Sequence, residues 1–159
     1  MAIPIRTEKE IVKLREACKL ASDVLVMIEP YVKAGVTTGE LDRICHEYMV
    51  NEQKVIPACL NYHGFPKATC ISINEVVCHG IPSDDKVLKN GDIVNIDVTV
   101  IKDGYFGDNS KMYIVGGETN IRSKKLVESA PALLKENAKK EEAEDIKAKL
   151  AAAQAEVTL

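Results

Sequence analysis

A predicted β-hairpin that carries two aspartates in its strands constrains the fold of this chain more than any other feature. Two alternating stretches, GDIVNIDVTVI (91–101) and YFGDNSKMYIV (105–115), flank a Lys-Asp-Gly sequence, and Asp-Gly between such stretches is a strong signal for a tight hairpin turn. Asp97 lies in the middle of the first stretch and Asp108 lies in the second. Because aspartate is depleted in strand interiors, these two carboxylates indicate a role other than building the sheet.

The length of the turn leaves two neighbouring registers open, in which either Lys102 or Ile101 pairs with Tyr105. If Lys102 pairs with Tyr105, Asp97 and Asp108 are diagonal neighbours on one face, with their Cβ atoms within roughly 8 Å. Carboxylates that close repel each other unless a cation or a shared proton lies between them, so this register favours a metal site. A slip of one residue would put them on opposite faces. The alternative interpretation is that Gly107-Asp108-Asn109 is simply a turn and that Asp97 is an isolated residue at a sheet edge.

Composition excludes several classes of protein. The chain has 159 residues, a net charge of −3 and 46% hydrophobic residues, which suits one globular domain and gives no basic surface for a nucleic acid. No run of about 18 apolar residues marks a membrane span. The N-terminus (MAIPIRTEKE) lacks the apolar core of a signal peptide, so we expect a cytoplasmic protein. The five cysteines have no repeated CxxC spacing, which favours reduced thiols, and Cys18, Cys45 and Cys78 are expected to pack in the core.

The last 42 residues differ in character from the rest of the chain. All glycines, phenylalanines, tyrosines, histidines and cysteines lie at or before Gly117, and the remainder is dominated by Lys, Glu, Ala and Leu. Such a change inside a chain of this length indicates one of two things. The segment is either a helical cap on the same domain or a piece of foreign origin.

The local patterns predict both helices and strands. A capping box at Thr7–Glu10 precedes apolar residues spaced by three and four, which predicts an amphipathic helix that stops at Pro30. A second box at 37–40 predicts a helix that runs to about Glu52. The other predicted elements are strands at 55–60 and 68–73, helices at 121–129 and 139–154, and short strands at 131–136 and 155–159.

Two longer stretches carry a resemblance to a known family. NYHGFPKATCISINEVVCHGIP and, after it, LKNGDIVNIDVTVIKDGYFGD closely resemble the bacterial type I methionine aminopeptidases, and the similarity runs from the N-terminus to about Leu126. These are cytoplasmic two-metal enzymes that remove the initiator methionine from nascent chains. The resemblance implies an α/β (α+β) protein, the N-terminal half of a pita-bread fold with an antiparallel sheet and two covering helices. A short helix-strand-helix-strand segment is expected to close it at the C-terminus.

The resemblance also implies roles for individual residues. It makes Asp97 and Asp108 ligands of a divalent metal pair, with Asp97 bidentate to one ion and Asp108 bridging both, and Mn, Fe, Co or Zn suits such carboxylates. His79, in VVCHGIP, matches the histidine that contacts the scissile amide, whereas a lone loop histidine outside this motif is more often a hydrogen-bonded structural residue. Sulfur and aromatic groups suit a thioether, and five residues match the lining of the methionine side-chain pocket: Cys59, Tyr62, His63, Phe65 and Cys70.

The sequence departs from the family in two places. Phe106 stands where members usually carry a histidine, directly before the Gly-Asp of the second strand. The family's second half supplies a histidine and two glutamates as the remaining ligands, and no histidine follows Asp108 here. The last part of the chain instead resembles the end of the acidic stalk protein of the large ribosomal subunit, in LVESAP and AEDIKAKL. We therefore expect a methionine aminopeptidase-like half domain at 1–120 and a stalk-like helical cap at 121–159, joined near 125–128.

Three hypotheses for the function follow. The first is a truncated or chimeric methionine aminopeptidase that acts on peptides with an N-terminal methionine and has little or no activity alone. The second is a non-catalytic folded module or an artificial chimera. In the third, a twofold dimer brings the two aspartates of each chain together, which supplies four carboxylates but no general base. We expect no nucleic-acid or membrane partner, and some homo-oligomerisation through the apolar surface that the missing half leaves open.

Overall fold

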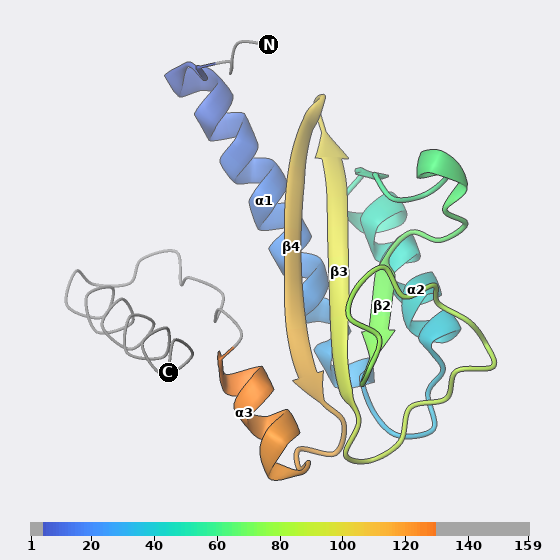
Figure 1. Ribbon diagram of the computed structural model, residues 1–159. Coiled ribbons are helices and arrows are strands. Elements are labelled where there is room, and N and C mark those ends of the chain that lie inside the picture. The colour runs from blue at the N-terminus through green and yellow to red at the C-terminus, as the bar shows by residue number, and fades with distance from the viewer. Residues whose placement is uncertain (1–4, 130–159) are drawn as a thin grey trace. The chain divides into compact units, whose positions relative to one another are not determined.

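The computed structural model of this chain describes residues 5–129, which fall into two compact units that divide between Thr119 and Asn120. The helices are α1 (Glu8–Ile28), α2 (Thr38–Glu47) and α3 (Ile121–Ser129), and the strands are β1 (Ile56–Pro57), β2 (Cys70–Ile73), β3 (Ile93–Lys102) and β4 (Tyr105–Ile114) (Figure 1). Short helical turns lie at Glu29–Tyr31, Tyr48–Glu52 and Tyr62–Gly64. The helix predicted at 139–154 and the strands predicted at 131–136 and 155–159 lie outside the described residues.

Helix α1 begins and ends where the sequence predicts. The Thr7 side chain accepts a hydrogen bond from the backbone N–H of Glu10 at 3.4 Å, and the Glu10 carboxylate accepts one from the N–H of Thr7 at 2.8 Å. Together they form the predicted capping box, which satisfies backbone donors that the first turn leaves unpaired. The regular helix ends at Ile28, and Pro30 lies in the following 3₁₀ turn.

Helix α2 begins with a side-chain cap, as α1 does, but its last turn is not a regular α-helix. The Thr37 side chain caps it by accepting from the N–H of Glu40 at 3.1 Å. The regular α-helix ends at Glu47, and residues 48–52 continue as a wider π turn that closes with a hydrogen bond from the N–H of Gln53 to the carbonyl of Tyr48. The predicted extent to about Glu52 is confirmed, but its last turn is not α-helical.

Two exposed cysteines contradict the prediction that Cys18, Cys45 and Cys78 pack in the core. Cys45 is buried, whereas Cys18 and Cys78 are exposed. On α1 it is Ala17, one residue earlier, that is buried, because the stripe facing the sheet passes through Ala17 rather than Cys18. The spacing of apolar residues gave the helix and its buried Ala21, Leu25 and Ile28 correctly, and was wrong for Cys18.

The antiparallel sheet has β3 at its centre. Strands β1 and β2 pair with one edge of β3, and β4 pairs with the other. The hairpin pairs Lys102 with Tyr105, and its two loop residues, Asp103 and Gly104, both have positive φ angles of 49° and 81°, as a type I′ turn requires. Of the two registers left open by the sequence, the structure has the one that puts both aspartates on the same face.

The core lies between one face of this sheet and the helices. Alternate side chains of β3 (Val94, Ile96, Val98 and Val100) are fully buried, and α1 packs against β3 and β4 while α2 contacts α1 (Figure 1). The side chains between them, which include those of Asn95, Asp97 and Thr99, project from the opposite face and are only partly buried. The two helices therefore cover one face and leave the aspartates on the other.

Helix α3 belongs to the second compact unit and confirms the helix predicted at 121–129. Its start is capped by Asn120, whose side-chain carbonyl accepts a hydrogen bond from the N–H of Ser123 at 2.9 Å. None of the helices in residues 5–129 combines the length and the apolar character that a bilayer crossing requires.

Candidate active site

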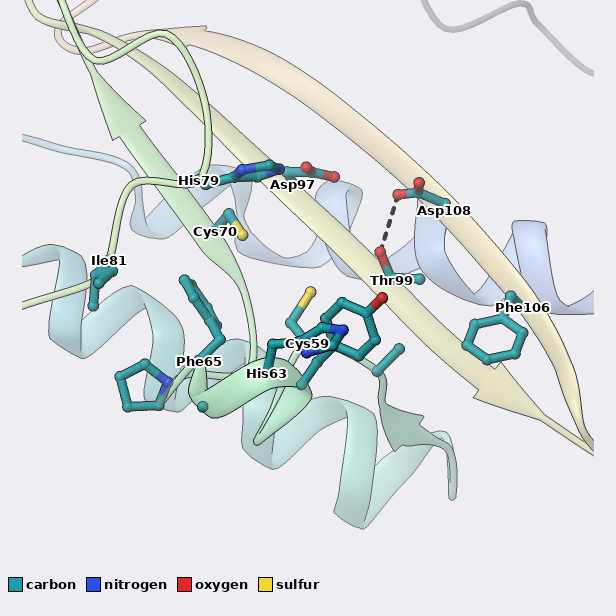
Figure 2. A pocket seen from close by; sticks show the side chains of 14 residues that line it. Cys59, His63, Phe65, Cys70, His79, Ile81, Asp97, Thr99, Phe106 and Asp108 are labelled. Atoms are coloured by element: carbon teal, nitrogen blue, oxygen red, sulfur yellow. Dashed lines mark hydrogen bonds between the residues drawn. The ribbon is translucent and has the colours of Figure 1, made fainter.

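A cleft of about 780 Å³ opens on the face of the sheet opposite the helices (Figure 2). It brings together all eight residues that the sequence singled out, from five separate segments of the chain: Cys59, Tyr62, His63, Phe65, Cys70, His79, Asp97 and Asp108. The lining also includes five residues that the sequence analysis did not assign to a site: Ala58, Gly64, Pro66, Ile81 and Thr99. Phe106, which stands where family members usually carry a histidine, lines the cleft as well. Thr99 could have been found from the hairpin register, since it is the direct cross-strand partner of Asp108.

The two aspartates come from adjacent strands. Thr99 pairs with Asp108 and Asp97 pairs with Ser110, so Asp97 and Asp108 are diagonal neighbours, as the chosen register predicts. The Thr99 hydroxyl donates to Oδ1 of Asp108 at 3.1 Å. Burial raises the pKa of the Asp97 carboxyl, and the charge of Asp108 and a hydrogen bond to it act in the same direction. The pair is therefore close enough for one carboxylate to disfavour ionisation of the other.

His79 reaches the cleft from the loop between β2 and β3. Its backbone is left-handed, with φ of 54°, and the following Gly80 lies directly against β2. The N–H of Ile71 donates to the carbonyl of Gly80 at 2.9 Å, and the N–H of Gly80 donates to Oγ of Ser72 at 3.1 Å. These bonds fix the loop so that the imidazole lies beside Asp97 (Figure 2), where it acts to lower the pKa of that carboxyl against the larger effect of burial.

The remaining predicted residues lie in and around the loop between β1 and β2. Tyr62 and His63 form an edge-to-face ring contact with centroids 4.4 Å apart. Cys59 and Cys70 bracket the loop, and their thiols interact. The interaction with Cys70 is the largest influence on Cys59 and lowers the pKa of Cys59 to about 7, while the same interaction and burial raise the pKa of Cys70. The cleft thus combines sulfur and aromatic groups with carboxylates.

Two carboxylates of the cleft are candidate ligands for a divalent metal. Asp97 and Asp108 offer carboxylate oxygens to a divalent cation, and their mutual repulsion is what a cation would relieve. Within residues 5–129, however, no cluster of three or more His, Cys, Asp or Glu side chains is arranged to hold a metal ion. This part of the chain therefore offers the two carboxylates as candidate ligands.

Comparison with known proteins decides the family. The model of metallopeptidase family M24 matches residues 12–156. The chain belongs to metallopeptidase family M24. Membership in this family implies the use of a divalent metal. The chain has an α/β fold with an antiparallel sheet and two covering helices, as the sequence predicts for half of a pita-bread fold.

Several M24 relatives are highly similar to this chain. The methionine aminopeptidase of Haemophilus influenzae is 97% identical over 134 residues, which make up 84% of this chain and 50% of the relative. That of Escherichia coli K12 is 70% identical over 119 residues, or 75% and 45% of the two chains. The chain thus spans about half the length of the curated relatives it matches.

Solved structures of M24 methionine aminopeptidases agree in fold. The enzyme from Rickettsia prowazekii superposes with a TM-score of 0.77 at 55% identity, covering 80% of this chain and 50% of that one. The enzyme from Thermotoga maritima gives a TM-score of 0.76 at 38% identity, covering 80% and 51%. These identities are high enough for the similarity to concern the family as well as the fold.

We expect the metal-free M24 chain to become more stable when the charge of Asp97 is removed. Because folding raises the pKa of this carboxyl above its ordinary value of 3.8, the folded state binds the proton more tightly than the unfolded state. The stabilisation that this group contributes to the free energy of unfolding is therefore lost as the pH rises through the interval between its two pKa values. Asp97→Asn should be the more stable protein at pH 7, by less than about 1 kcal/mol because the side chain is half-exposed. Urea unfolding in EDTA at pH 7 and at acidic pH measures both effects, and a variant less stable than the parent at pH 7 would contradict them.

Proposed function

We propose that residues 5–119 form one half of a methionine aminopeptidase, which recognises peptides with an N-terminal methionine, and that this chain alone has little or no activity. One observation carries the proposal: the residues assigned to the metal, the scissile amide and the methionine pocket all line one cleft. The high identity of the chain to methionine aminopeptidases of two bacteria supports it. Removal of the initiator methionine in the cytoplasm is the reaction to which this half belongs, and five free thiols are consistent with that reducing compartment.

The carboxylates and the histidine have separate roles in this proposal. Asp97 and Asp108 hold divalent metal through their oxygens, which suit Mn, Fe, Co or Zn, and Thr99 orients Asp108 through the 3.1 Å hydrogen bond. A bound metal pair supplies Lewis acidity and an activated water. His79 contacts the scissile amide from the rim of the cleft, where its side chain is exposed to an incoming peptide.

The sulfur and aromatic side chains of the cleft receive the methionine side chain. Cys59, Tyr62, His63, Phe65 and Cys70 provide sulfur and aromatic contacts, each worth about 0.3–1.5 kcal/mol for a thioether sulfur near a ring. The volume of about 780 Å³ leaves room for the residue that follows the methionine as well. Selectivity for an unbranched apolar side chain follows from this chemistry.

Low activity of the single chain follows from the number of ligands. A two-metal hydrolase needs both ions clamped and a water oriented between them. In residues 5–129 no three His, Cys, Asp or Glu side chains are arranged to hold one metal ion, and no histidine follows Asp108 in the sequence. The alternatives are a non-catalytic folded module or artificial chimera, and a homo-oligomer in which a second chain completes the metal site.

The C-terminal part is proposed to have another origin. We assign a methionine aminopeptidase-like half domain to 1–120 and a stalk-protein-like cap to 121–159, with the junction near 125–128. The change in composition after Gly117 supports this assignment. The M24 family match extends to residue 156, so the competing possibility is a divergent continuation of the M24 sequence.

The proposal is tested by hydrolysis of the peptide Met-Ala-Ser with Mn²⁺ or Co²⁺ added. The chain and its Asp97→Ala variant are compared with the full-length Haemophilus influenzae relative as a positive control. We expect no turnover by either form of this chain, and a metal-induced rise in the unfolding midpoint of the parent that Asp97→Ala abolishes. Turnover by the parent and not by the variant would contradict the predicted inactivity, and a parent unaffected by metal would contradict the ligand assignment.

A further inference from the structure

We propose that Cys59 and Cys70 form a reversible disulfide that closes the base of the loop between β1 and β2. All five cysteines are free in the structure, and these are the two that share a cleft. The loop that they bracket, residues 60–69, carries Tyr62, His63 and Phe65. The inference concerns thiol chemistry and stands whether or not the cleft binds a peptide or a metal.

The arrangement of two short strands brings these cysteines together. Strands β1 and β2 lie end to end along the same edge of β3. The N–H of Ala58 donates to the carbonyl of Thr99 at 2.8 Å, and Cys70 pairs with Asp97. Ala58 and Cys70 thus face residues two apart on β3, a separation of about 7 Å along the strand. Cys59 follows Ala58 toward Cys70 and is closer to it, which places the two cysteines near the Cα separation of about 4.4–6.8 Å found in disulfides.

The two side chains enter the same cleft. Figure 2 shows Cys59 and Cys70 there, and the thiols are close enough for each to shift the pKa of the other. Cys59 is partly exposed, whereas Cys70 is only 7% exposed. A reactant in solution therefore meets Cys59 first, and Cys70 is the neighbour that resolves the product.

The chemistry balances with a low-molecular-weight disulfide, such as glutathione disulfide, as the oxidant. The Cys59 thiolate attacks one sulfur of that disulfide, forms a mixed disulfide and releases one thiolate. Cys70 then loses its proton and attacks the Cys59 sulfur, which forms the Cys59–Cys70 bond and releases the second thiol. Two protein thiols are oxidised by two electrons and one small disulfide is reduced to two thiols, and excess thiol reverses the sequence.

The structure offers two matched control cysteines. Cys18 on α1 and Cys78 in the loop before His79 are both exposed. Each is expected to accept glutathione and to keep it as a mixed disulfide. Replacing both with serine should leave the Cys59–Cys70 reaction intact and remove the background.

The experiment treats the full Cys18→Ser/Cys78→Ser chain with glutathione disulfide, followed by alkylation, intact mass measurement and non-reducing peptide mapping. We expect the loss of two hydrogen masses and a peptide that links Cys59 to Cys70, with no glutathione retained. Adding Cys70→Ser should trap glutathione on Cys59, and adding Cys59→Ser should slow modification of Cys70 at least about tenfold. Circular dichroism verifies that each variant is folded. Retention of glutathione on Cys59 with Cys70 present, or no reaction at either residue while Cys18 and Cys78 of the parent react, would overturn the proposal.

Discussion

Replacing Asp42 with alanine is expected to lower the free energy of unfolding by about 3 kcal/mol, because two buried backbone donors would lose their acceptor. Asp42 lies on α2 and is only 5% exposed. Its Oδ1 accepts three hydrogen bonds, from the N–H of Ala68 at 3.0 Å, the N–H of Thr69 at 2.9 Å and the hydroxyl of Thr69 at 2.9 Å. These bonds attach the end of the 60–69 loop to the helix. Urea unfolding followed by circular dichroism measures the loss.

Asp42→Asn is the matched control for this prediction. All three bonds end on a single oxygen, and the asparagine side chain keeps one carbonyl oxygen of the same geometry. We therefore expect this variant to lose less than about 1 kcal/mol. If the asparagine and alanine variants were equally unstable, the acceptor would not be the property that matters. The wall of the cleft would then depend on the charge of Asp42 rather than on its hydrogen bonds.

Gly107→Ala is expected to destabilise the protein by about 3 kcal/mol, at the upper end of the range for overpacking a core. A Cβ atom built at Gly107 collides with the backbone carbonyl of Ala17, where β4 passes closest to α1. Because the obstacle is backbone, no side chain can rotate away or be trimmed to make room. The helix and the strand would have to separate along the contact that carries much of the core. The same urea measurement applies.

Gly117→Ala separates this collision from a simple loss of glycine. Gly117 has φ of 79° and nothing within 4 Å of its built Cβ, so its replacement costs only the left-handed conformation, roughly 1–2 kcal/mol. Gly107 has no positive φ, so its cost comes from the collision alone. A Gly107→Ala variant no less stable than Gly117→Ala would show that α1 can move away from β4 without penalty.

The hairpin shows how far local sequence determines the structure. An Asp-Gly turn with positive φ at both loop residues selects one register, and that register alone fixes which face carries Asp97 and Asp108. The convergence of the two cysteines, the aromatic loop and His79 could not be obtained this way, because it depends on pairing between strands far apart in the sequence. It was predicted only through resemblance to a family, and the cleft agrees with it.

Three other features of the structure could not be predicted from the sequence, each for a physical reason. The left-handed backbone of His79 is held by bonds between Gly80 and β2, which no local pattern encodes. The exposure of Cys18 depends on which side of α1 the sheet lies, a choice that apolar spacing leaves uncertain by one position. The hydrogen bond from Thr99 to Asp108 follows from the register, but threonine in a strand carries no signal of its own.

Side chains of β3 alternate between the core and the opposite face of the sheet, so substitutions at alternate positions have different consequences. Its even-numbered positions from Val94 to Val100 are fully buried against the helices, while the odd-numbered positions between them lie on the opposite face, where Asp97 and Thr99 line the cleft. Substitutions at odd positions can alter what the cleft accepts while the core stays intact, and substitutions at even positions alter folding while the cleft keeps its chemistry. A lineage that has lost catalysis can therefore drift at every second residue of this strand and still retain the fold.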